Sequence, residues 1–329
     1  MNREEAFRPR WPSGVPGYEI WFAVVIDPES RQGLWVRYTT FQAPGHPGEA
    51  LLWASFFDAA NPERHAFNAI SRDLAAARIE PERLIMPDGA TMTPDGFQGA
   101  IRTGPGVLKW ELSLTHRFLP IWHGPKLLES SRFVSVQSSV VSPFAGASGE
   151  VRLGTRTFRL KNARAVLTHI SGRERVPELF WVFAPALDGL PDSGLEAVAV
   201  RPARFSPTIV SASMHLGSDF YHTTTMAESL FFHRQKRYPE GRLRFSLGPH
   251  KIALEARLQE EQKTGYIYRG PSGDARFVVQ SDVSSVAWRI KGPRPAAGRL
   301  DDSAAVEFHA HRPLPNVMYL DPFRIEGPI

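Results

Sequence analysis

Short apolar or alternating runs, separated by turn signals, make up most of this chain. The alternation is clear at 242–247 and at 253–258, where side chains of opposite character follow one another. Pairs such as Pro44-Gly45 and Asp88-Gly89 separate the runs. Period-two alternation between turns is typical of antiparallel strands, so the pattern predicts an all-β fold and not a series of βαβ units.

Strands are expected throughout the chain. The predicted ranges are 19–26, 34–42, 50–57, 97–103, 107–115, 149–153, 156–160, 178–185, 195–201, 242–247, 250–258, 264–269, 274–280, 284–290 and 304–310. Two stretches depart from the pattern. The range 65–79 is compatible with a short helix or an irregular strand, and 219–238 with a crossover that contains a helix.

The length of the chain predicts more than one domain. A chain of 329 residues exceeds what a single hydrophobic core usually organises. Pro, Gly and Asp gather at 186–193, which makes this segment the best candidate for a linker.

Composition narrows the classes of partner. The formal net charge is +5, but the basic residues are scattered along the chain, so no nucleic-acid partner is expected. The chain has no cysteine, which excludes disulfides, thiolate metal sites and a cysteine nucleophile. The first residues lack a secretory pattern, and the apolar runs are too short for stable membrane insertion. We therefore expect a cytoplasmic protein.

Several spaced motifs resemble a known family. They are the strand Tyr18-Glu19-Ile20-Trp21-Phe22, the segment from Ser142-Pro143 to Gly154, and His169 with Gly172 followed by Trp181. In this order they resemble the double-lipocalin family of carotenoid 1,2-hydratase, the AttH-like proteins and, more distantly, tocopherol cyclase. The resemblance implies two lipocalin-like antiparallel barrels, with an extension at 1–14, barrel 1 at 15–187 and barrel 2 at 188–329.

The resemblance also implies an apolar ligand. We expect an isoprenoid or polyketide-like molecule in a barrel or in a cleft between the barrels, and no cofactor or metal. Proton-assisted hydration, cyclisation or isomerisation is the reaction class. The hydratase has a Tyr-Asp pair on the strand after the Trp-rich one, whereas this chain has Leu195-Glu196-Ala197 there. Glu196 could substitute as an acid, and a non-catalytic carrier of lipid-like molecules is the alternative.

Glu19 and His169 are the candidate catalytic residues. Glu19 and Trp21 share one face of a predicted strand, where an indole beside a carboxyl would favour its protonated, acidic form. His169 could orient a ligand hydroxyl or relay a proton. A rim ion pair for Glu19 and a backbone hydrogen bond for His169 are the structural alternatives.

The remaining candidates would contact the ligand. The aromatic set consists of Trp21, Trp35, Tyr38, Trp110 and Trp181, and the polar set of Asp219, Tyr221 and His222 would cover the pocket or form an exposed loop.

Two weaker hypotheses belong to other classes of function. Glu307, His309 and His311 alternate on one predicted strand and so face the same way. Two histidines at this spacing occur as zinc ligands in all-β enzymes, but the sequence does not identify a third ligand to join them. A carbohydrate-binding sandwich would use Trp35 and Trp53 as exposed stacking platforms.

Overall fold

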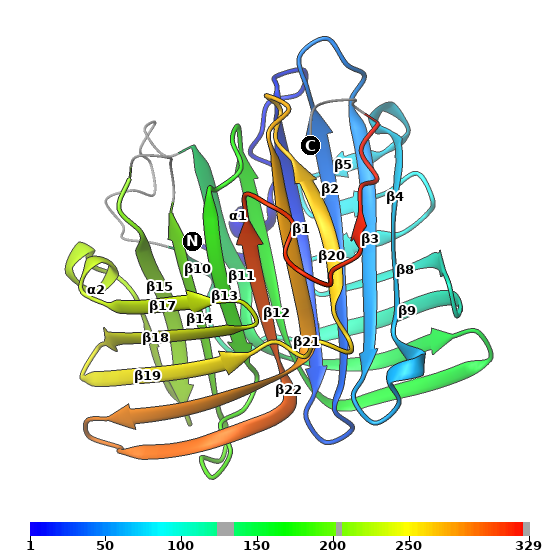
Figure 1. Ribbon diagram of the computed structural model, residues 1–329. Helices are drawn as coiled ribbons and strands as arrows, with labels where there is room; N and C mark the ends of the chain where they lie inside the picture. Colours follow the sequence, from blue (N-terminus) through cyan, green and yellow to red (C-terminus); the bar gives the residue numbers. More distant parts are fainter. Residues whose placement is uncertain (124–134, 202–205, 325–329) are drawn as a thin grey trace.

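Two curled β-sheets make up the computed structural model, which describes residues 1–123, 135–201 and 206–324. Within these residues the strands form sheets of 12 and 11 strands that are almost entirely antiparallel. Figure 1 shows the two sheets side by side, with strands of the first standing next to strands of the second at the centre of the molecule. The all-β prediction is confirmed.

The first sheet has the strand order β4-β3-β2-β1-β12-β11-β9-β8-β7-β6-β5, with β10 paired to β11. Its strands are β1 (Gly17–Asp27), β2 (Gln32–Gln42), β3 (Glu49–Asp58), β4 (Ala66–Asp73), β5 (Arg78–Glu80), β6 (Arg83–Ile85), β7 (Thr91–Thr93), β8 (Gly96–Thr103), β9 (Gly106–Thr115), β10 (Ile121–Trp122), β11 (Val136–Leu153) and β12 (Arg156–Gly172). Helix α1 (Arg3–Phe7) precedes it, and the 3-10 turns η1 (Pro62–Arg64) and η2 (Leu74–Ala76) flank β4. The doubtful stretch 65–79 is thus largely a strand.

The second sheet has the strand order β16-β15-β14-β13-β22-β21-β19-β18-β17, with β20 paired to β21 and β23. Its strands are β13 (Glu178–Ala184), β14 (Ser193–Arg201), β15 (Ile209–Leu216), β16 (Asp219–His222), β17 (His233–Arg237), β18 (Glu240–Leu247), β19 (His250–Arg257), β20 (Thr264–Arg269), β21 (Ala275–Lys291), β22 (Ala296–Ala310) and β23 (Tyr319–Leu320). Helix α2 (Met226–Leu230) lies in the segment where a helix-bearing crossover was expected.

The chain passes from one sheet to the other earlier than the sequence suggested. The first sheet ends at Gly172, and β13 already pairs with β14 and β22 of the second sheet. The Pro-, Gly- and Asp-rich segment 186–193 forms most of the connection of the β13–β14 hairpin and the first residue of β14, with a bridge between Leu187 and Leu190. Its composition indicated a turn, which a hairpin and a linker need equally.

The buried hydrophobic side chains form three clusters. One fills the first curled sheet, a second fills the other, and a third lies between the two. Strand β1 belongs to two of them, because Trp21 and Val25 point into the first sheet while Ile20 and Val24 belong to the layer between the sheets. The contacts between sheets come mainly from β1, β2 and β3 on one side and β21 and β22 on the other. None of the helices in the described residues is both long and apolar enough to span a membrane.

Candidate functional site

A cavity of about 180 Å³ lies in the layer between the two sheets. Strands β1, β2 and β12 of the first sheet line one side, and β13, β14 and β22 of the second line the other. Most of its surface is apolar, with Ile20, Phe22, Ile170, Leu179 and Val198 among the lining side chains. A ligand here would touch the outer faces of both barrels, not the interior of either one.

Strand alternation explains which residues reach this cavity. In β14, Val198 and Val200 line the cavity, whereas Ala197 and Ala199 belong to the core of the second sheet. The same rule places Trp181 of β13 in the cavity, because successive side chains of a strand point to opposite faces.

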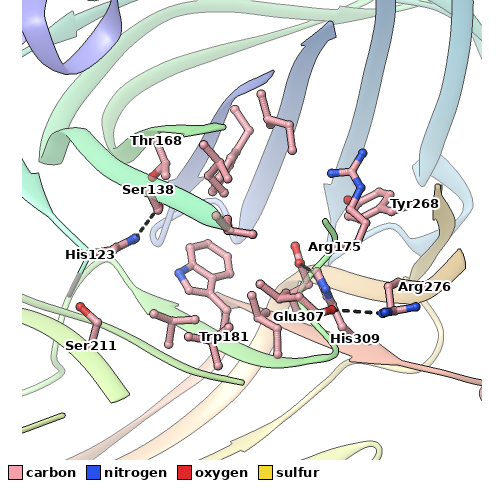
Figure 2. Close-up of a pocket in the computed structure, with 18 of the residues that line it drawn as sticks. His123, Ser138, Thr168, Arg175, Trp181, Ser211, Tyr268, Arg276, Glu307 and His309 are labelled. Carbon is pink, nitrogen blue, oxygen red and sulfur yellow. Dashed lines mark hydrogen bonds and ion pairs between the residues drawn. The ribbon is translucent and has the colours of Figure 1, made fainter. Parts of the chain in front are cut away.

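A hydrogen-bonded carboxyl–imidazole pair lies at one end of the cavity. Glu307 and His309 both project from β22 into the cavity, and Glu307 Oε1 is hydrogen-bonded to His309 Nε2. The His309 ring also meets Tyr268 edge-on, with 5.7 Å between ring centroids. Burial lowers the pKa of His309 and outweighs the opposing effect of Glu307, so the imidazole is neutral near neutral pH. Figure 2 shows these side chains together at one side of the pocket.

Two arginines accompany Tyr268 at this end. The Arg37 guanidinium lies 3.9 Å from the centroid of the Tyr268 ring, and that of Arg175 lies 3.7 Å from the Tyr18 ring. Arg37 Nε donates to Thr39 Oγ1 at 3.0 Å, and Arg175 Nε donates to the carbonyl of Arg269 at 3.0 Å. Burial lowers the pKa of Arg175 to about 10.

The opposite end contains a second polar group. His123 contacts Ser138 Oγ through Nδ1 at 3.0 Å and Glu196 Oε1 through Nε2 at 3.4 Å. Trp181 Nε1 also donates to Glu196, at 3.0 Å. Burial acts to raise the pKa of Glu196, but the charge of His123 and hydrogen bonds from His123, Trp181 and Ser213 outweigh it and lower the pKa. Glu196 is therefore held as a carboxylate, which can accept a proton but is a poor donor.

Glu19 and His169, the predicted catalytic residues, lie together but on the other face of the sheet. His169 Nε2 contacts Glu19 Oε1 at 2.8 Å, and its ring stacks on Trp21 with 4.6 Å between centroids. Neither Glu19, His169 nor Trp21 is among the residues lining the cavity. Their direct neighbours Tyr18, Ile20, Thr168 and Ile170 line it instead.

These residues hold the N-terminal segment on the first barrel. Glu19 accepts a hydrogen bond from the backbone of Arg10 at 2.5 Å, and His169 Nδ1 contacts the carbonyl of Ala6 at 2.9 Å. Trp21 Nε1 donates to the carbonyl of Phe7 at 2.7 Å. Phe7 is fully buried in the core of the first sheet. The arrangement accounts for the burial of Glu19 and His169 by a structural role, and a catalytic role for them stays a prediction.

Of the other predicted contacts, Trp35 and Trp181 line the cavity. Tyr38 and Trp110 lie in the core of the first sheet, where Trp110 Nε1 donates to Tyr38 Oη at 3.3 Å. The predicted polar set is on the edge strand β16, away from the cavity lining.

Burial decides the carbohydrate hypothesis. Trp35 is 2% exposed and Trp53 is 0% exposed, so neither indole is available as a stacking platform and that hypothesis is wrong. Both rings pack on Tyr266 of β20 in the layer between the sheets.

Sequence reasoning considered Glu307 and His309 only as metal ligands. The two side chains instead bond to each other, and the part of the chain that the structure describes contains no cluster of three or more potential ligands. Arg37, His123, Arg175 and Tyr268 were not singled out, because no local pattern marks residues that come together from different strands.

Comparison with known proteins gives no family model that matches the chain. Two uncharacterized proteins of Mycobacterium tuberculosis, from strains CDC 1551 / Oshkosh and ATCC 25618 / H37Rv, are each 28% identical to it over 195 residues. The match covers 59% of this chain and 57% of each relative, so the chain spans less than two thirds of the length of these curated relatives.

Solved structures share the fold over most of the chain. An AttH-like protein from Nitrosomonas europaea aligns with a TM-score of 0.59 and 14% identity, covering 90% of this chain and 93% of that one. Kievitone hydratase from Nectria haematococca aligns with a TM-score of 0.53 and 9% identity, covering 90% of both chains. CghA in complex with Sch210972 aligns with a TM-score of 0.55 and 12% identity, covering 90% of this chain and 88% of that one. The protein therefore has the double-lipocalin fold of the AttH-like proteins, as the sequence motifs predicted.

Proposed function

We propose that the protein is a cofactor-independent enzyme that binds an apolar small molecule between its two barrels and moves a proton on it. Hydration, cyclisation and isomerisation are the reactions of this class. The observation that carries the proposal is the Glu307–His309 pair at one end of a mainly apolar cavity. A buried imidazole bonded to a carboxylate is an effective proton acceptor and donor in a site that contains little water.

In this proposal each member of the pair has its own role. Because the pKa of His309 is lowered, the ring is neutral, and its Nε2–H donates to Glu307. The other ring nitrogen is then an acceptor that can take a proton from the ligand or from water. Glu307 stabilises the imidazolium that forms, so the proton can be returned to a different atom.

The structural relatives support the proposal through their shared fold. One bears the name of a hydratase, and another was crystallised with the small molecule Sch210972. Their identities of 9% and 12% restrict the support to the fold, and the identity of the substrate is not carried over.

The absence of the hydratase's Tyr-Asp pair favours a different member of this class over carotenoid hydration. It also keeps the carrier as the second candidate, because an apolar cavity serves a carrier as well as an enzyme.

Native mass spectrometry followed by incubation in D₂O separates the candidates. A molecule that co-purifies with the protein is extracted and returned to fresh protein in D₂O, and its mass is measured by mass spectrometry after incubation. Turnover by the wild type should change its mass or introduce deuterium, and His309→Gln and Glu307→Gln should stop this. His311→Gln is the matched control, because His311 is exposed and lies two residues further along the chain. An unchanged molecule in the wild type would favour the carrier.

The same assay tests the earlier hypothesis. If Glu19→Gln abolished turnover without affecting stability while His309→Gln had no effect, the catalytic site would lie on the other face of the sheet.

A further inference from the structure

Arg37 and Arg175 are buried arginines that line the cavity, and no carboxylate in the described part of the chain pairs with either. Arg37 is 3% exposed and Arg175 is 6% exposed. Among the residues described here, neither forms an ion pair, and the Nη2 atom of each has no hydrogen-bond partner. The hydroxyl of Tyr268, next to Arg37, has no partner either. One end of the cavity thus presents several unused hydrogen-bond donors.

Neighbouring arginines show what such a group normally requires. Arg269 Nη2 pairs with Asp321 at 2.6 Å, and Arg276 Nη2 pairs with Asp274 at 3.0 Å. Glu307, the carboxylate on the cavity side, is already bonded to His309. A buried charge is costly unless it is paired, and buried polar atoms are almost always hydrogen-bonded. The unpaired arginines therefore indicate a partner that is not among the residues which the structure describes.

We propose that the ligand carries an anionic oxygen group, a carboxylate or an acidic enol, which binds Arg37, Arg175 and Tyr268 while its apolar body lies along the cavity. This inference rests on the proposed function, and it defines the substrate class of the same site. Guanidinium groups suit such ligands because they donate several hydrogen bonds to a planar anion.

The placement also explains the position of the proton-transfer pair. Tyr268 lies between the arginines and His309, and its ring contacts both Arg37 and the imidazole. An acid group held at Tyr268 would bring the adjoining carbon atoms of the ligand beside His309. The apolar remainder would lie against Leu179 and Val198, which line the cavity. It would extend toward His123, which Figure 2 shows on the opposite side of the pocket from Tyr268.

Binding of three matched probes tests the inference. Octanoate, 1-octanol and octylamine have the same apolar chain and differ in the head group. Calorimetry and tryptophan fluorescence report binding, since Trp35 and Trp181 line the cavity. The wild type should bind octanoate about tenfold or more tightly than 1-octanol, because hydrogen bonds to charged groups are the stronger ones. Octylamine should bind most weakly.

Substitutions locate the preference. The double variant Arg37→Met with Arg175→Met should lose the preference for octanoate and bind 1-octanol as the wild type does. Arg173→Met is the matched control, because Arg173 is exposed in the same segment. If the double variant does not fold, the single variant Arg37→Met and the thermal shift of the wild type with each probe give the same comparison.

The failures are distinguishable. Equal binding of octanoate and 1-octanol by the wild type, or a preference retained by the double variant, would overturn the acid-binding inference and leave the cavity as a ligand site. The larger side chain of Val198→Trp should fill the cavity and prevent binding of both octanoate and 1-octanol. If neither of these probes bound the wild type, or if both still bound Val198→Trp, the proposed function would be wrong as well.

Discussion

Asp282 should make the stability of this protein depend on pH. The residue lies on β21 and is 0% exposed. Gln280 Nε2 donates to its Oδ1 at 2.7 Å, while Oδ2 has no partner in the described residues. Burial raises the pKa of Asp282 to about 7, and the single hydrogen bond from Gln280 offsets this only in part.

The sign and size follow from the difference between the folded and unfolded chains. The pKa in the unfolded chain is close to the ordinary value of 3.8, so the folded state binds the proton more tightly. The contribution of Asp282 to the free energy of unfolding is fully present below the unfolded pKa of 3.8 and is lost as the pH rises through the folded pKa of about 7. A shift of about 3 units corresponds to about 4 kcal/mol. About 2.5 kcal/mol of this should disappear between about pH 5 and about pH 8.

Urea unfolding near each of these pH values measures the effect. Asparagine at position 282 has the shape of aspartate but cannot ionise. Between about pH 5 and about pH 8 the free energy of unfolding of the wild type should therefore fall by about 2.5 kcal/mol more than that of Asp282→Asn. Asp188→Asn, at an exposed aspartate, is the control and should follow the wild type. Parallel pH profiles for wild type and Asp282→Asn would refute the reasoning.

Two further predictions concern the N-terminal segment. Phe7→Ala should lower the free energy of unfolding by about 3–4 kcal/mol, because the ring is fully buried in the first core, and urea unfolding measures this. His169→Ala removes the contacts with Glu19 and Ala6 and the stacking on Trp21, and should cost about 3 kcal/mol. Limited proteolysis should then cut residues 1–16 faster than in the wild type, and an unchanged cleavage rate would contradict the anchoring role.

Much of the fold could be predicted from the sequence because strands and turns leave local patterns. The alternating runs near 242–258 became β18 and β19, whose outer faces are solvated. The connection at 186–193 shows where local reasoning ends. A turn composition does not tell whether the strands on either side pair with each other, and that pairing decides which sheet β13 joins.

The candidate site was harder to predict for a related reason. Glu19 and Trp21 do share a face of β1, as period-two spacing requires. Strand β1 is buried on both faces, however, so its apolar pattern does not distinguish the core of the first barrel from the layer between the barrels. On this strand, a choice of the wrong face displaces the predicted contacts by one residue, which is why Tyr18 and Ile20 line the cavity while Glu19 does not.

The position of the cavity follows from how the two barrels are filled. The interior of the first contains Trp110 and the buried Phe7 of the N-terminal segment, and the interior of the second contains Phe180 and Trp288. The polar end of the cavity combines Arg37 from the first sheet with Tyr268 and His309 from the second. Neither sheet carries this arrangement alone, so the site exists only when both are folded and docked. A substitution that loosens the contact between sheets should therefore weaken ligand binding before it unfolds either barrel.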